Sequence, residues 1–320
     1  MTHIFHLLDD FLVIDQPHAM GERTMALLCM VFRRLKIPLS VHKTIGSSTT
    51  IEYLGITLDS EEMQARLPPD KVTRILHFLR AMLLKSSCTK RELQQLLGHL
   101  NFAMRVILAG RTFVSYLLTL MTAIKEPHHH GRLSRECKKD IRMWIILLQD
   151  WNGVSFFYDR HFTSNPNFEL FTDAASTIGF GGYFQSQWFA SLWPRELVTA
   201  TGVSAPSMSF LELYPIVVAA LIWGKSWSTK RILFHCDNKG TVDIINKGRS
   251  KSPNIMSLMR RLTWCAATYN FTVNARHVPG VKNTIADALS RFKFQDFRRA
   301  APTAASQPCP CPDLHHVMWD

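Results

Sequence analysis

Four acidic residues in the second half of the chain have the chemistry of a site for divalent cations. They are Asp173, Glu212, Asp237 and Asp287, and each lies beside a run of apolar residues. Hard ions such as Mg²⁺ bind oxygen ligands, and two such ions roughly 3.5–4 Å apart need several converging carboxylates. Carboxylates from separate strand ends and helix starts can supply such a site, which is typical of metal-dependent phosphodiester chemistry.

Each acid also has a purely structural interpretation, which the sequence leaves open. Asp173 fits a turn after a strand, and Asp287 fits the first turn of a helix, facing the positive end of its dipole. Glu212 follows Ser209 at the spacing of a capping box, and Asp237 fits the N-cap of a helix. The order of the surrounding elements favours one shared site over four separate caps and turns.

The elements that must position these acids follow a definite order. The sequence predicts a glycine-rich hairpin over 168–184, a third strand over 188–193 and a helix that carries Glu212. A strand that ends at Asp237 comes next, followed by further helices and a strand over 271–278. Asp287 then lies at the start of a last helix.

The region 167–292 resembles the ribonuclease H domain of retroelement reverse transcriptases, and the segment 277–287 (HVPGVKNTIAD) carries much of the likeness. Members of that family have a mobile histidine ten residues before the last aspartate and an asparagine four residues before it. His277 and Asn283 stand at those positions. The resemblance implies an α/β fold in which a mixed five-stranded sheet is flanked by helices.

The resemblance also implies an activity, endonucleolytic hydrolysis of the RNA strand of an RNA–DNA hybrid. Two Mg²⁺ ions, or Mn²⁺ in their place, are expected on the four acids, and no small-molecule cofactor is expected. Asp173 and Asp237, with help from Asp287, would hold the ion that activates water. Asp173, Glu212 and Asp237 would hold the ion at the leaving oxygen. His277 would shuttle protons or help product leave, which suits an imidazole at neutral pH.

Nucleic-acid contacts are expected from side chains around the same site. The first candidates are Asn238, Lys239, Arg276 and Asn283. Other basic side chains fit either phosphate contacts or solvated helix faces: Lys247, Arg249, Lys251, Arg260, Arg261 and Lys282.

The first half of the chain contains a second set of motifs. Residues 7–10 (LLDD) resemble the reverse transcriptase palm motif, with Leu7 at the usual aromatic position, although Asp9 and Asp10 also fit a solvated hairpin turn. Lys43 and the segment 51–55 resemble later palm motifs, including the hairpin that grips the primer. Polymerase chemistry needs a further aspartate from a strand before this hairpin, so the site is interpreted as vestigial and no polymerisation is expected from this chain alone.

These motifs predict five regions. They are a truncated palm over 1–62, a thumb-like helical block over 63–127, a connection helix over 128–165, the ribonuclease H-like domain over 166–293 and a disordered Ala/Pro-rich tail over 294–320. The thumb-like block resembles that of DIRS-type retrotransposons. The histidine run 128–130 is interpreted as a polar loop.

The composition agrees with a nucleic-acid partner. The net charge of +12 in 320 residues suits a polyanion such as an RNA–DNA hybrid. The seven cysteines are scattered, which favours reduced thiols and a cytoplasmic or nuclear rather than secreted protein. No membrane span is expected, because Arg111 and Thr112 interrupt the apolar stretch 106–124.

Three alternatives to the active nuclease remain at this point. The chain could be a catalytically idle nucleic-acid-binding remnant, or a subunit that completes a split RNA-directed DNA polymerase with a protein partner. An integrase or transposase with the same kind of fold is disfavoured by the helix start at 286–288 and by the thumb-like block.

Overall fold

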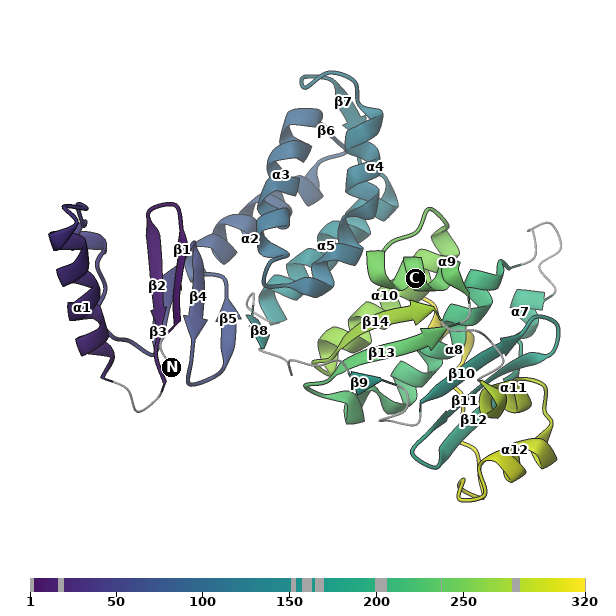
Figure 1. The fold of residues 1–320 in the computed structure, drawn as a ribbon. Helices are drawn as coiled ribbons and strands as arrows, with labels where there is room; N and C mark the ends of the chain where they lie inside the picture. The colour runs from purple at the N-terminus through teal and green to yellow at the C-terminus, as the bar shows by residue number, and fades with distance from the viewer. Residues whose placement is uncertain are drawn as a thin grey trace.

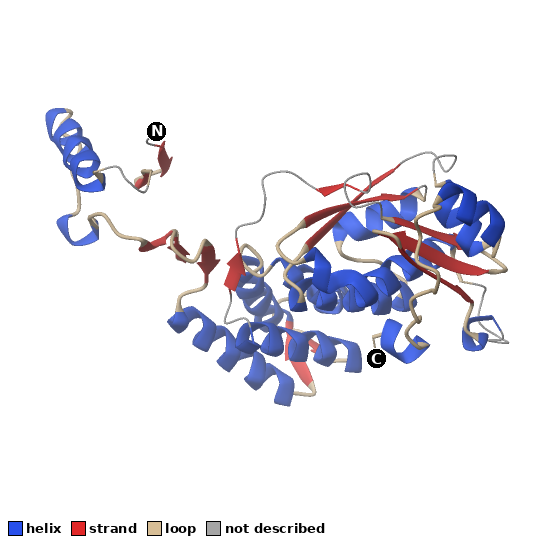
Figure 2. Cartoon of the chain, turned by 90° about the horizontal axis from the view of Figure 1, so that it is seen from below, coloured by secondary structure: helices blue, strands red, loops and turns tan. Residues whose placement is uncertain are grey.

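The structure of the chain is a computed structural model. It describes residues 3–16, 20–150, 154–156, 163–164, 170–198, 206–236, 238–277 and 283–319. Figures 1 and 2 show three parts in chain order, which are an extended N-terminal arm, a block of helices and an α/β domain.

The N-terminal arm, residues 3–66, is built from a hairpin, one long helix and a small sheet. Residues Leu7 and Asp10 pair at the end of the hairpin, so its loop is Leu8–Asp9, one residue earlier than predicted. Leu54 and Gly55 both have positive φ (50° and 75°), as a two-residue hairpin loop requires. The elements are β1 (His3–Leu7), β2 (Asp10–Ile14), α1 (Gly21–Arg34), η1 (Val41–Lys43), β3 (Thr50–Tyr53), β4 (Ile56–Asp59) and β5 (Gln64–Arg66), and β8 (Val154–Phe156) extends the sheet.

The helical block has its own apolar core, formed by leucines at helical spacing. The predicted capping box is confirmed: the backbone N–H of Thr89 donates to Glu92 Oε2 (2.8 Å), and that of Glu92 donates to Thr89 Oγ1 (3.2 Å). The elements are α2 (Pro69–Leu84), β6 (Ser87–Thr89), α3 (Lys90–Ala103), η2 (Leu108–Val114), α4 (Ser115–Ala123), β7 (His130–Arg132) and α5 (Arg135–Asp150). Helix α5 packs against α2 and α4, so it belongs to this block.

The α/β domain contains two three-stranded sheets. Strands β10 (Phe171–Ala175), β11 (Gly179–Phe184) and β12 (Gln187–Leu192) form an antiparallel sheet, as the predicted glycine-rich hairpin requires. Strand β13 (Arg231–Cys236) lies parallel to both β14 (Thr272–His277) and β9 (Thr163–Ser164). The helices are α7 (Arg195–Val198), α8 (Met208–Trp223), η3 (Gly224–Trp227), α9 (Lys239–Lys247), α10 (Pro253–Thr268), α11 (Thr284–Ser290), α12 (Phe294–Ala300) and α13 (Leu314–Val317).

The mixed α/β fold is therefore confirmed, whereas the single five-stranded sheet is not found among the described strands. A strand has two edges, and those of β13 pair with β14 and β9. Residues Ile232 and Leu233 face β9 across one edge, so that stretch of β13 does not offer its hydrogen bonds to β10.

Helix α8 forms the centre of the α/β core. It packs against β10 and α10, and nearly all of its side chains between Phe210 and Ala220 are buried. Within the described residues, Met208–Trp227 is the segment long and apolar enough to cross a membrane, and 72% of it is buried inside the protein. Burial of most of its surface explains its mostly apolar sequence.

The disordered tail predicted for 294–320 differs from the structure, in which residues 283–319 are described and fold back onto the domain. Val317 has no exposed surface, and the Arg261 guanidinium lies 4.7 Å from the ring centre of Trp319. The Trp188 indole N–H donates to the carbonyl of Ala305 at 2.8 Å. The Ala/Pro-rich composition predicted disorder, but the few large apolar residues near the end bury enough surface to fix the segment.

Candidate carboxylate site

Asp173 lies in the middle of β10, and helix α11 is attached directly beside it. The Ser290 hydroxyl donates to Asp173 Oδ2 at 2.6 Å, which fixes the rotation of this carboxylate. The Asn283 side-chain amide donates to the carbonyl of Thr172 at 2.8 Å. Both ends of α11 are thus bound to the strand that carries Asp173, and this docking brings the helix of Asp287 to the site.

A glycine makes this close approach possible. Gly181 of β11 pairs with Asp173 across the sheet, and a Cβ atom at this position would lie 2.6 Å from the Cβ of Leu289. Any larger residue would push α11 away from the sheet. The glycine-rich hairpin in the sequence therefore serves the site, because it lets a helix lie on the strand pair.

Asp287 is half exposed and forms an ion pair within its own helix. Its Oδ1 lies 2.7 Å from Arg291 Nε, one helical turn further on. The hydrogen bond from Arg291 to Asp287 and the charge of this carboxylate, with a smaller contribution from Asp173, raise the pKa of Arg291. The two aspartates therefore lie close enough to act on one guanidinium.

Glu212 reaches the same region from α8, which packs on β10. Its side chain is only 7% exposed, and burial of a carboxylate is costly unless a cation or hydrogen-bond donors compensate it. The capping-box interpretation does not hold, since the N-cap of α8 is Ser207, whose hydroxyl accepts from the backbone N–H of Phe210. Glu212 thus lies within the helix, in a position that helix capping does not require.

Asp237 lies outside the described residues, but the residues on both sides of it are defined. Cys236 ends β13, and Asn238 is the N-cap of α9, where its Oδ1 accepts from the backbone N–H of Thr241 at 2.9 Å. The Ser209 hydroxyl lies 3.1 Å from the same oxygen. The start of α8, one turn before Glu212, is therefore bound to the start of α9.

His277 is the last residue of β14, and its side chain is exposed. In the parallel ladder it pairs with Cys236, the residue before Asp237. The predicted histidine thus lies at the strand end from which the third acid follows.

The donor chemistry of this site fits hard divalent cations, because the described ligand candidates are the carboxylates of Asp173, Glu212 and Asp287. These three do not by themselves bring their oxygens within 4.8 Å of one another in the described part of the chain. A two-ion site therefore needs Asp237 and rotation of the half-exposed Asp287 away from Arg291.

The predicted nucleic-acid contacts divide into two groups. Lys239 and Arg276 are exposed near the ends of α9 and β14, where phosphates can reach them. The side chains of Asn238 and Asn283, by contrast, form hydrogen bonds within the protein. That of Asn238 joins α8 to α9, and that of Asn283 joins α11 to β10. Their roles in binding nucleic acid stay predictions.

Two of the further basic candidates have structural roles. Arg260 is 3% exposed and forms ion pairs with Asp140 and Glu136 of the helical block. Arg261 stacks on Trp319 and donates to the carbonyl of Met318 at 2.9 Å. Their cationic groups are directed into the protein, which sequence spacing on an amphipathic helix does not reveal.

The acids of the first half are arranged differently. Asp9 and Asp10 are exposed at the end of the hairpin. The Tyr53 hydroxyl donates to the backbone carbonyl of Asp10 at 3.4 Å. The Lys43 side chain is exposed in η1 and forms no hydrogen bond or ion pair with any described residue. No converging set of ligands is present there among the residues that the structure describes.

Ser290 and Arg291 are site residues that the sequence reasoning missed. They lie three and four residues after Asp287, so they share its helix face. That spacing was the available signal, but a serine and an arginine at a helix end are common enough to be overlooked.

Comparisons with known proteins give only a coarse likeness. No family model matches the sequence, and no curated protein matches it. Among solved structures, the fold is similar to foamy viral protease-reverse transcriptase dRH in complex with ds DNA, with a TM-score of 0.39 and 14% identity over 85% of this chain. It is also similar to foamy viral protease-reverse transcriptase in complex with RNA/DNA hybrid (TM-score 0.37, 13% identity, 88% of this chain) and with dsDNA (0.37, 13%, 87%). The chain spans 46%, 36% and 55% of those three chains, respectively.

Proposed function

We propose that this chain is a metal-dependent endonuclease that hydrolyses the RNA strand of RNA–DNA hybrids. The observation that carries the proposal is the docking of α11 on β10. The hydrogen bonds Ser290–Asp173 and Asn283–Thr172 attach the helix of the last acid to the strand of the first. A turn aspartate at 173 and a helix-start aspartate at 287 with separate structural roles would not need their elements joined in this way.

Bound Mg²⁺ ions would supply polarisation of the phosphate and a water of lowered pKa. The residues of the chain would hold and orient these groups. Ser290 keeps Asp173 in one orientation, Glu212 contributes a carboxylate that is shielded from solvent, and Asp287 can exchange Arg291 for a cation. His277, exposed at the end of β14, would take up or deliver a proton.

The test is a cleavage assay with the purified full chain. Labelled RNA–DNA hybrid, duplex DNA and duplex RNA are each incubated with Mg²⁺ and with a chelator. The proposal expects cleavage of the RNA strand of the hybrid alone, and only with Mg²⁺. Binding of the hybrid without any cleavage would instead identify the chain as a catalytically idle nucleic-acid-binding remnant.

A second candidate function, a subunit that completes a polymerase with another chain, is favoured by the exposed apolar side chains of the arm. Phe5, Leu8, Leu27 and Leu35 are each at least half exposed. Copurification with a chain that covers them, together with template-directed nucleotide incorporation by the complex, would establish this function. A monomer that cleaves hybrids alone would contradict it.

A further inference from the structure

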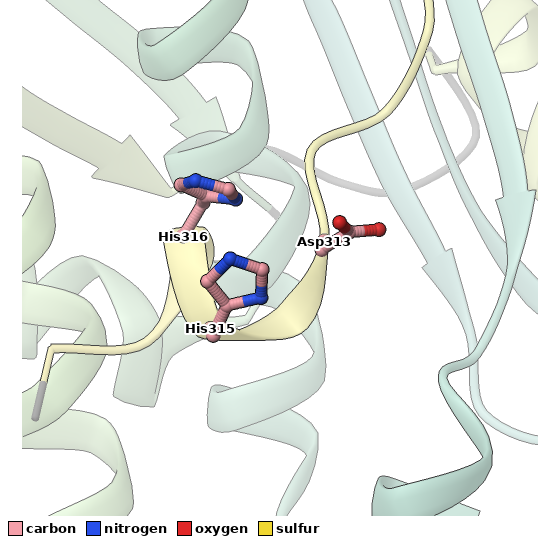
Figure 3. A group of neighbouring side chains, drawn as sticks. All are labelled: Asp313, His315 and His316. Atoms are coloured by element: carbon pink, nitrogen blue, oxygen red, sulfur yellow. The ribbon is translucent and has the colours of Figure 1, made fainter.

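The C-terminal turn gathers three metal-ligand side chains that the nuclease site does not use. Asp313, His315 and His316 each offer a ligand atom, and these atoms all lie within 4.8 Å of one another. Figure 3 shows the three side chains around the start of α13, and all three are exposed. An ion can therefore reach them from solvent.

Neither the helix nor its surroundings explain this arrangement. Asp313 is the N-cap of α13, yet its carboxylate accepts no capping hydrogen bond. Consecutive residues on a helix point about 100° apart, but the ring centres of His315 and His316 are only 3.9 Å apart. The Asp313 carboxylate is not used in the helix cap and the two imidazoles lie together beside it, so the three side chains occupy positions that suit a shared ion.

We propose that Asp313, His315 and His316 bind a divalent ion of the zinc class. Two imidazole nitrogens and one carboxylate oxygen are ligands that Zn²⁺ prefers, and Zn²⁺ leaves a fourth position open. Tetrahedral Zn²⁺ needs ligand atoms roughly 3.4 Å apart. Exposed side chains reach this spacing from within 4.8 Å by small rotations about their χ angles.

The ligand set contains nitrogen and oxygen but no sulfur. Cys311, two residues before Asp313, does not bring its sulfur into this group. Asp313, His315 and Glu196 line one cavity of about 830 Å³, so water or the Glu196 carboxylate would be available to complete the coordination.

Metal binding would stabilise the docked C-terminal segment. Helix α13 has only four residues, too few to be stable by itself. Its position matters because Val317 is fully buried and the backbone N–H of Trp319 donates to Ser257 Oγ of α10 at 2.6 Å. An ion held by three residues of this turn would restrict the same backbone that places Val317 and Trp319.

Cobalt binding by the full chain tests the site. The chain is freed of metal with a chelator, Mg²⁺ is added in excess to occupy the carboxylate site, and Co²⁺ is titrated as a visible probe for zinc sites. We expect one equivalent with a tetrahedral d–d band that Zn²⁺ removes. Absence of the band, or a strong thiolate charge-transfer band, would overturn the proposed ligand set.

The variant His315→Gln/His316→Gln should lose at least tenfold in affinity. The matched control is His128→Gln/His129→Gln, which changes the other close histidine pair (ring centres 4.6 Å apart) and should bind Co²⁺ as the unaltered chain does. Equal binding by the first variant, or a loss confined to the control, would refute the assignment.

A second readout tests the structural consequence. Amide hydrogen exchange of residues 313–319 should slow when Zn²⁺ is added to the unaltered chain, and should not respond in His315→Gln/His316→Gln. Unchanged exchange in the unaltered chain at saturating Zn²⁺ would show that the ion does not stabilise the docked segment.

Discussion

The N-terminal arm and the α/β domain contain similar local patterns but differ in what covers them. Among the described residues between 3 and 58 only Leu12 and Phe32 are buried, whereas twelve of the sixteen residues of α8 are buried. Helix α1 has an apolar stripe of the same kind as the helices of the domain. Local sequence therefore suffices to form a helix or hairpin, but burial needs a second layer, and in the described chain only the domain and the helical block provide one.

The acids repeat this difference. Asp9 and Asp10 are exposed on a hairpin that contacts α1 through Phe11 and Phe32, whereas Asp173 lies under α11 and beside α8. A cation site needs side chains held in place by their neighbours. The comparison thus predicts chemistry in the domain and none in the arm.

Substitution of one acid in each region has the largest expected effect. Asp173→Asn should reduce hybrid cleavage on the order of 10³-fold, since several kcal/mol of transition-state stabilisation depend on the bound ions. Asp9→Asn should leave the rate unchanged. The initial cleavage rates of both variants are measured at saturating Mg²⁺. Comparable losses of rate in the two variants would contradict the assignment of the chemistry to the domain alone.

The junction between the helical block and the domain should be the next most sensitive feature. Arg260, at 3% exposure, pairs with the fully buried Asp140. Arg260→Met leaves that carboxylate without its partner, which should lower the free energy of unfolding by about 3–5 kcal/mol. Arg33→Met on the arm is the control and should stay within about 0.5 kcal/mol. Urea denaturation followed by circular dichroism measures both, and a neutral Arg260→Met would show that the junction is solvated.

Apolar truncations compare the same kind of residue in the two regions. Leu213 of α8 is fully buried, and Leu27 of α1 is 50% exposed. Leu213→Ala should cost about 2–5 kcal/mol, because it leaves a cavity in the core. Leu27→Ala should change the free energy of unfolding by less than about 0.5 kcal/mol. An equally large loss for Leu27→Ala would mean that another surface covers the arm in solution.

Much of the domain could be predicted because its signals are local. The glycine-rich hairpin at 171–184 and the helix of Glu212 follow from residue spacing, as does the capping box at Thr89 in the helical block. The pairing of β13 with β9 could not be predicted, because strand partners are set by contacts between distant segments. The docking of the C-terminal segment was missed for a related reason. Its overall Ala/Pro-rich composition predicted disorder, whereas two individual side chains, Val317 and Trp319, hold it on the domain.

For the candidate site, sequence reasoning found the acids but not the residues that hold them. Asp173, Glu212 and Asp287 stand out because acids beside apolar runs are unusual. Ser290 and Gly181 act through a single hydrogen bond and a missing Cβ atom, which become visible only when α11 lies on the sheet. Supporting residues of this kind require the tertiary structure.

The smallest expected effect concerns helix caps. Helix α3 begins with the Thr89–Glu92 box, whereas α1 begins at Met20 without a side-chain cap. Thr89→Ala should therefore cost about 1 kcal/mol, and Met20→Ala almost nothing.

The Lys85 ammonium, followed by the backbone N–H of Thr89, lowers the pKa of Glu92 in the folded state. The unfolded state therefore binds the Glu92 proton more tightly than the folded state does. The contribution of Glu92 to the free energy of unfolding is fully present above its unfolded-state pKa of about 4.5, and it is lost as the pH falls through the lower folded-state pKa. In urea denaturation, Glu92→Gln should make the free energy of unfolding depend less on pH in the acidic range. An unchanged pH dependence would show that the Thr89–Glu92 capping box is not formed in solution.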